Sequence, residues 1–197
     1  VRGDGELLEA RRLLDRAAQA AGFGPIWYYA YTYKRAGKPW PREYPLEALE
    51  AVSAMTGDLL MLQEAGERAR MLLEGRRDDL SQGMIAEAAR IGCHGQAFYA
   101  MAQAFNAAQG DPATRPDALA LAAEVDCARE AVVEAMAIIE THKPHYMVPS
   151  CLRDMSVLWE FLGFLSEQLA EVAAGTREWS QIEWFIANEI AQQGRAT

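Results

Sequence analysis

Cysteine is scarce in this sequence, and its few copies argue against a disulfide-stabilised protein. Three cysteines, Cys93, Cys127 and Cys151, are spread widely over 197 residues. An odd number of separated cysteines does not describe a disulfide framework, and a chain of this length can bury a sufficient core without one. The N-terminus also lacks the basic-then-apolar order of a secretory signal. We therefore expect reduced thiols and a cytoplasmic location.

Positive charge is in short supply as well. The chain carries 19 Lys and Arg residues against 28 Asp and Glu residues, which gives a formal net charge of -9. Binding to nucleic acid or to an anionic membrane surface requires an excess of basic residues on one face. Apolar runs of the ~20 residues that a membrane-spanning helix needs are also missing. The composition predicts a soluble acidic protein that binds neither nucleic acid nor membranes.

What the sequence has is helical periodicity, and it is most complete between Ser150 and Gly175. Apolar residues recur there at steps of three and four, and further aromatic rings widen the stripe. The stripe consists of Leu152, Met155, Leu158, Leu162, Leu165, Leu169 and Val172, widened by Trp159, Phe161 and Phe164. A helix that is apolar over most of its circumference is typical of the centre of a bundle. We expect this helix at the centre, with Ser150 as its N-cap and Gly175 at its C-terminal turn.

Similar patterns along the rest of the chain predict an all-α protein. We expect a single domain over residues 1–197, folded as an antiparallel helical bundle of about seven helices, four of them long. The predicted helices span about residues 4–21, 25–35, 45–74, 79–109, 115–142, 150–175 and 177–193, with loops at 37–45 and 110–117 and frayed ends at 1–5 and 194–197. Alternating tyrosines in the second of these segments also fit a strand.

The segment 26–44, called here the aromatic segment, carries the strongest functional signal. It holds five of the seven tyrosines, two of the five tryptophans and two of the three lysines. A short element cannot bury so many rings in a core of its own, and Tyr and Trp are favoured at interfaces. The predicted binding residues are Trp27, Tyr29, Tyr31, Tyr33, Lys34, Arg35, Lys38, Trp40 and Arg42. The alternative is that this segment packs over one end of its own bundle.

Three side chains that could be reactive lie around the start of the helix predicted at 150–175. His142, His145 and Cys151 could form a Cys–His nucleophile pair or a set of metal ligands. Pro144 lies between the two histidines, so they do not share a helical face, and the chain has no Glu-x-x-His unit of the kind that di-iron bundles use. We therefore expect no bound metal and no cofactor. Inert loop histidines and a packed cysteine are the simpler interpretation.

Two further patterns fall in the segment 79–109. Arg90 and His94 lie four residues apart on one helical face. This pair resembles that of the HEPN type of all-helical RNA nucleases, which carry one more residue between the two. A hydrogen-bonding pair at the surface or between helices is the simpler interpretation. Nearby, Ala88, Gly92 and Gly95 form a small-residue patch that predicts close approach of another helix backbone, and we also consider this patch as a second contact face.

Taken together, these features favour a non-enzymatic binding protein that associates with itself or with a protein partner through the aromatic segment. An alternative is a small-molecule-binding protein, with a pocket for an anionic or aromatic ligand inside the bundle and the aromatic segment as its cover. An enzyme that uses Cys151 with His142 and His145 is the third hypothesis.

Overall fold

In a computed structural model, the structure describes residues 2–20, 53–142 and 149–184. These residues form α-helices and short 3-10 helices, and no strand occurs among them, so the predicted all-α class is confirmed. The described part of the chain contains five α-helices, and the helix predicted at 25–35 lies outside it. They are α1 (Arg2–Ala20), α4 (Thr56–Leu73), α5 (Asp79–Gln109), α6 (Ala118–Thr141) and α7 (Pro149–Ala173), with the 3-10 helices η1 (Pro112–Thr114) and η3 (Trp179–Gln181).

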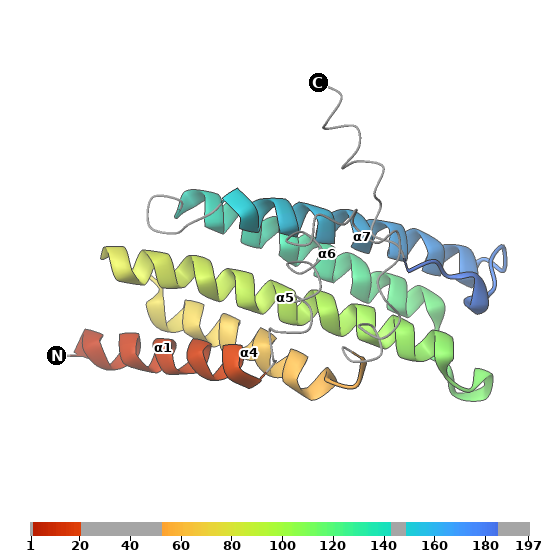
Figure 1. Cartoon of the computed structure of the whole chain (residues 1–197), viewed down its shortest axis with the longest axis horizontal. Coiled ribbons are helices and arrows are strands. Elements are labelled where there is room, and N and C mark those ends of the chain that lie inside the picture. Colours follow the sequence, from red (N-terminus) through yellow and green to blue (C-terminus); the bar gives the residue numbers. More distant parts are fainter. Residues whose placement is uncertain (1, 21–52, 143–148, 185–197) are drawn as a thin grey trace, which may run out of the picture.

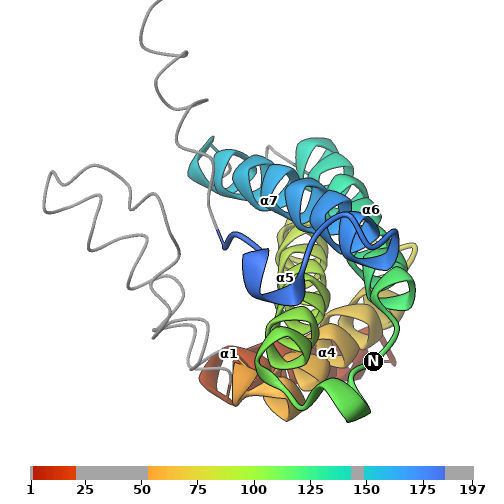
Figure 2. The same cartoon turned by 90° about the vertical axis from the view of Figure 1, so that its right-hand side faces the viewer.

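The five helices lie side by side, and consecutive helices run in opposite directions (Figure 1). In the end-on view of Figure 2, α1 and α4 lie on one side of α5, and α6 and α7 lie on the other. Helix α5 packs against α4 and α6 most extensively, and it also contacts α1 and α7. The centre of the described bundle is therefore α5.

This arrangement corrects the prediction that the helix at 150–175 is central. Helix α7 packs chiefly on α6, and its contact with α5 is slight. Leu162, Leu165 and Leu169 of the predicted stripe are fully buried, but Trp159 and Phe164 are only half-buried. The width of an apolar stripe was misleading because α5 is buried largely through alanine and glycine, which add little apolar weight.

Helices α4 and α5 touch through their backbones. A Cβ atom added at Gly66 would lie 2.6 Å from the Gly92 Cα, and one added at Gly95 would lie 2.6 Å from the Leu59 carbonyl oxygen. The predicted close approach at the small-residue patch is thus confirmed, and the approaching helix is α4. The patch is buried against α4, so the prediction of a second contact face there is wrong. Gly66 of α4 is part of this crossing, because its missing side chain leaves room for the α5 backbone.

Helix α6 meets α7 around an arginine. The Arg129 guanidinium lies over the Trp159 ring, 4.1 Å from its centroid. Gly163 makes room for it, because an added Cβ there would lie 2.8 Å from the guanidinium carbon. A cation over a tryptophan face is a favourable contact.

The predicted C-terminal turn at Gly175 is confirmed, and the start of α5 also follows local capping preferences. Asp78 is the N-cap of α5, and its carboxylate accepts a hydrogen bond from the Ser81 backbone N–H. Gly175 has a φ of 72°, and the Thr176 N–H donates to the Glu171 carbonyl oxygen at 3.0 Å. This is the pairing of a Schellman motif, which favours glycine. Other ends differ from the prediction. Helix α7 begins at Pro149, so Ser150 lies inside the helix and is not its N-cap.

The helix predicted from Pro45 to Glu74 is interrupted. Within its described part, Ala54 and Met55 form a turn, and α4 begins at Thr56.

The helix predicted from Arg177 is also wrong over its described part. Trp179–Gln181 form a 3-10 turn, and the chain continues to Trp184 without an α-helix. Trp184 packs edge-to-face on Phe105 of α5, with ring centroids 5.2 Å apart. Packing of these aromatic rings across the end of the bundle overrides the local helical periodicity.

Candidate functional site

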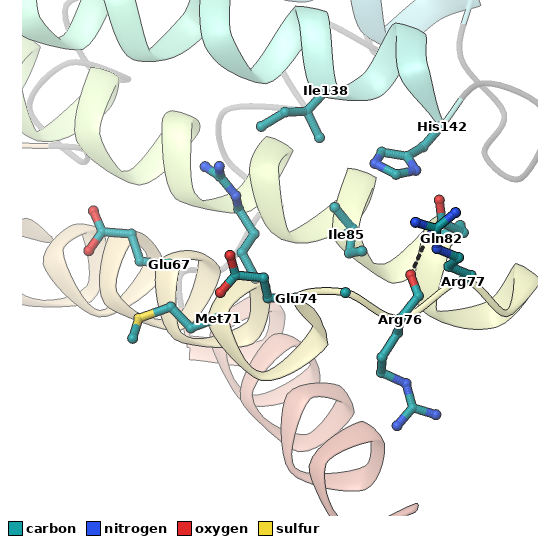
Figure 3. Close-up of a pocket in the computed structure, with 11 residues that line it drawn as sticks. Glu67, Met71, Glu74, Arg76, Arg77, Gln82, Ile85, Ile138 and His142 are labelled. Atoms are coloured by element: carbon teal, nitrogen blue, oxygen red, sulfur yellow. Dashed lines mark hydrogen bonds between the residues drawn. The ribbon is translucent and has the colours of Figure 1, made fainter. Parts of the chain in front are cut away.

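The most distinctive surface feature of the described residues is a groove along α5, with α4 and α6 as its walls (Figure 3). Its volume is about 920 Å³. The loop from Glu74 to Arg77, which joins α4 to α5, closes one end. The groove is lined by Glu67, Arg70, Met71, Glu74, Gly75, Arg76, Arg77, Gln82, Ile85, Ile138 and His142.

The middle of the groove is apolar. Ile85 comes from α5, Ile138 comes from α6 on the opposite wall, and Met71 comes from α4 (Figure 3). Met71 is 74% exposed, the highest value among the exposed large hydrophobic residues of the described chain. A large apolar side chain that is mostly in water loses the free energy of burial, about 2 kcal/mol, unless something covers it. The groove therefore presents apolar surface that a ligand can bury.

The loop end of the groove carries two arginines, Arg76 and Arg77, together with Glu74. The Arg76 guanidinium bonds to two residues that do not line the groove. Its Nε donates to the Ser81 hydroxyl at 2.8 Å and to the Asp78 carboxylate at 3.3 Å. The Gln82 side-chain amide donates to the Arg76 carbonyl oxygen at 2.6 Å and so fixes the loop on α5. Arg77 is exposed and forms no ion pair with the described residues.

One ion pair crosses from wall to wall. Arg70 of α4 donates to the Glu134 carboxylate of α6 at 2.7 Å. The two side chains are 38% and 61% exposed, so water screens the pair and its contribution to stability is small, at most about 1 kcal/mol. It nevertheless holds two long side chains across the groove beside Ile138.

The predicted binding residues cannot be placed in this site. Trp27, Tyr29, Tyr31, Tyr33, Lys34, Arg35, Lys38, Trp40 and Arg42 all lie outside the described residues. His145 and the side chain of Cys151 lie outside them too. His142 is described: it is the C-cap residue of α6 and lines the groove (Figure 3).

Arg90 and His94 do not pair through their side chains. The Arg90 guanidinium donates to the Glu87 carboxylate one turn earlier, while His94 Nδ1 lies 2.7 Å from the Arg90 carbonyl oxygen. A carbonyl oxygen only accepts, so Nδ1 carries the proton of the neutral ring. Cys93 Sγ is 3.7 Å from that nitrogen. A nitrogen that already carries a proton cannot deprotonate the thiol, so this pair is not arranged as a nucleophile and its base.

Burial governs the charge of His94. The side chain is 4% exposed, and burial lowers its pKa from 6.5 to about 4, with the Arg90 charge acting in the same direction. The Arg90 carbonyl and the Glu87 carboxylate act against this shift. The ring is therefore neutral near pH 7 and functions as a core residue with a hydrogen bond. Among the described residues there is no group of three or more His, Cys, Asp or Glu side chains that could hold a metal ion.

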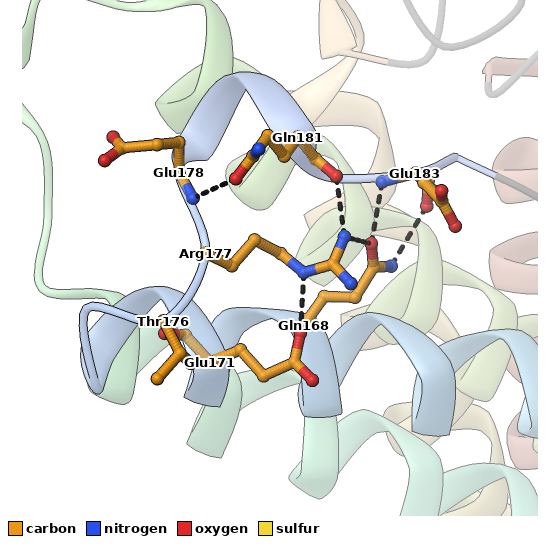
Figure 4. Close-up of polar contacts among 7 residues, drawn as sticks. All are labelled: Gln168, Glu171, Thr176, Arg177, Glu178, Gln181 and Glu183. Carbon is orange, nitrogen blue, oxygen red and sulfur yellow. Dashed lines mark hydrogen bonds and ion pairs between the residues drawn. The ribbon is translucent and has the colours of Figure 1, made fainter.

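A second polar cluster is structural. The Arg177 Nε donates to the Glu171 carboxylate at 2.6 Å, and Nη1 donates to the Gln168 side-chain oxygen and the Gln181 carbonyl oxygen (Figure 4). Gln168 is buried and pairs with both the backbone N–H and the carbonyl of Glu183. These bonds hold the segment after α7 on that helix, and they leave no side chain in a reactive arrangement.

The groove could have been noticed in the sequence from two signals. Met71 falls beside the apolar stripe of its helix, next to Leu72, so it had to be exposed or to bind something. Arg76 and Arg77 directly follow a glycine in an otherwise acidic chain. What the sequence did not provide was that α6 would bring Ile138 and His142 opposite these residues.

Comparisons with known proteins leave the family open, since no family model, curated protein or solved structure matches this chain. In the described residues, no helix is both long and apolar enough to span a membrane.

Proposed function

We propose that this protein acts by binding, as a non-enzymatic helical protein, and that the groove between α4 and α6 is one of its binding sites. The observation that carries this proposal is the position of Met71, exposed and apolar, in the same groove as Arg77, which forms no ion pair in the described chain. Pockets for small ligands typically combine an apolar lining with a few polar groups in about 300–1,000 Å³. The volume of the groove lies in that range, and its lining combines three large apolar side chains with a larger number of polar ones.

The aromatic segment is proposed as a second contact surface, through which the chain associates with itself or with a protein partner. Its aromatic and basic composition supports this proposal. In this view the whole chain is a single-domain antiparallel bundle that presents both surfaces, in the cytoplasm, with no nucleic acid or membrane as partner. A ligand pocket inside the bundle, covered by the aromatic segment, is the alternative.

Catalysis is the less supported function. Of the three residues in the Cys–His hypothesis, His142 is the one whose side chain is described, and it lies in the groove beside Ile138 and Gln82. Arg90 and His94, the other candidate pair, form hydrogen bonds within α5: Arg90 with the Glu87 carboxylate, and His94 with the Arg90 carbonyl oxygen.

Native mass spectrometry of untagged protein tests the proposal, because one spectrum reports both oligomeric state and bound small molecules. We expect either a dimer or a monomer with a small-molecule adduct that is lost on denaturation. A monomer without adduct, which remains so at increasing protein concentration and in the presence of candidate ligands, would contradict a binding function.

A further inference from the structure

We propose that the groove between α4 and α6 binds an amphipathic monocarboxylic acid. Its carboxylate pairs with Arg77 at the loop end, and its hydrocarbon part covers Met71, Ile85 and Ile138. This inference rests on the proposed binding function and names the ligand class of the groove.

The apolar part of the ligand follows from the walls. Ile85, Ile138 and Met71 come from three different helices, and all three line the same groove of about 920 Å³ (Figure 3). A short or medium hydrocarbon chain fits this volume. Each methylene that the groove removes from water strengthens binding by about fourfold.

The acidic head of the ligand follows from which cations of the lining are already paired. Arg70 binds Glu134, and Arg76 binds Asp78 and Ser81. Arg77 forms no ion pair in the described chain and lies on a loop that Gln82 holds in place. A guanidinium presents parallel N–H donors that match a carboxylate in two bonds. Arg77 is thus the anchor for a single carboxylate.

The same lining excludes a second acidic group. Glu67 comes from α4 at the end of the groove opposite the loop, whereas Glu74 is the first residue of the loop (Figure 3). A ligand with a carboxylate at each end and one of them on Arg77 would place the other near Glu67, and like charges repel. The groove therefore prefers a monocarboxylate over a dicarboxylate of the same length.

Isothermal titration calorimetry of the full chain at low salt provides the test, with butanoate, octanoate and octanedioate as probes. We expect octanoate to bind at least tenfold more tightly than butanoate, and octanedioate to bind more weakly than octanoate. Equal affinities for butanoate and octanoate would overturn the apolar part of the site. Tighter binding of octanedioate would overturn the role assigned to Glu67.

Variants locate the binding. Arg77→Ala should weaken octanoate binding by about tenfold or more, because it removes a charged hydrogen-bond partner. Met71→Gln should shrink the difference between octanoate and butanoate, while Arg12→Ala, which removes an exposed arginine of α1, should change neither. Both groove side chains are exposed, so their replacement leaves the core intact. Octanoate binding that is unaffected by Arg77→Ala would overturn the proposal.

The result also separates this inference from the function on which it rests. If none of the three acids binds but the native mass spectrum shows a dimer or another adduct, the ligand class is wrong and the binding function stands. If neither experiment detects binding, the proposed function itself fails.

Discussion

At the scale of single residues, His94 couples stability to pH. Its pKa is about 4 in the folded protein, below the ordinary value of 6.5. The unfolded chain therefore binds more protons than the folded chain between these values, and stability is lost as the pH falls from about 6.5 towards 4. The loss attributable to this side chain is at most about 3 kcal/mol.

Urea denaturation at a series of pH values measures this effect, and His94→Gln is the matched variant. Glutamine does not titrate, so its curve should be flatter than that of the wild type between pH 6.5 and 4.5, whatever its stability at neutral pH. Parallel curves would mean that His94 keeps an ordinary pKa and is accessible to water.

The hydrogen-bond partner of His94 and its burial could not be predicted from the sequence. Arg90 and His94 were correctly singled out as neighbours on one face of a helix. Periodicity could not reveal that His94 would contact a backbone carbonyl rather than the guanidinium, because that choice depends on rotamers and burial. Asp78 and Gly175 were predictable, since capping needs only the local chain and follows fixed residue preferences.

At the scale of elements, the α4–α5 crossing depends on glycine. Gly95→Ala would place a Cβ atom 2.6 Å from backbone atoms of α4, and backbone cannot move aside as a flexible side chain does. We expect a loss of about 1–3 kcal/mol in the free energy of unfolding, the usual cost of overpacking. Gly57→Ala is the control, because nothing lies within 4 Å of its added Cβ atom. Its effect should be neutral or stabilising, by up to about 1 kcal/mol. Similar losses in both variants would mean that the helices do not touch.

Leu162 of α7 tests the packing of the other half of the bundle. The residue is fully buried, so Leu162→Ala removes apolar contacts and leaves a cavity, with an expected loss of about 2–5 kcal/mol. Leu119→Ala, at a position of α6 that is 61% exposed, should cost less than about 0.5 kcal/mol. Chemical denaturation of the two variants measures the difference. A loss below about 1 kcal/mol for Leu162→Ala would show that the site is exposed or collapses easily.

The choice of central helix shows where sequence reasoning fails at this scale. Large apolar residues made α7 look like the centre, whereas α5 is the helix with neighbours on both sides. Burial by close approach requires small residues, and those carry a weak hydrophobic signal. The small-residue patch at Ala88, Gly92 and Gly95 predicts a backbone contact correctly, and such a contact is typical of a helix with close neighbours.

At the scale of the whole molecule, the open question is the role of the aromatic segment. It either forms a contact surface for another chain or packs on its own bundle. If it is a contact surface, replacing Tyr33 and Trp40 by alanine should weaken self-association by about 2 kcal/mol or more, the usual effect of truncating an interface anchor. Folding stability should stay largely intact. Association should also weaken as salt rises, because Lys34, Arg35 and Lys38 are basic in an acidic protein. Analytical ultracentrifugation at two salt concentrations measures both effects.

Denaturant melts of the same double variant complete the comparison. A protein that is monomeric at both salt concentrations, and whose double variant loses stability alone, would exclude the contact-surface proposal. The sequence predicted the all-α class of the whole molecule because helical periodicity is repeated in every long segment. The groove is lined by residues of three helices, α4, α5 and α6. Their packing is not encoded in any local sequence pattern, so the groove could not be predicted from the sequence.

The order in which the helices pack has a kinetic consequence. Helix α4 packs on α5, α5 on α6, and α6 on α7, so most contacts join segments that are near one another along the chain. Chains dominated by such local contacts lose little loop-closure entropy before contacts form, so they fold faster than chains of similar length that depend on distant contacts. The hairpin of α4 and α5, joined by a short loop with Gly75 at a φ of 77°, is the natural starting point. Folding can then spread outwards from it one helix at a time, so α5 should be the last helix to exchange its amide hydrogens with solvent.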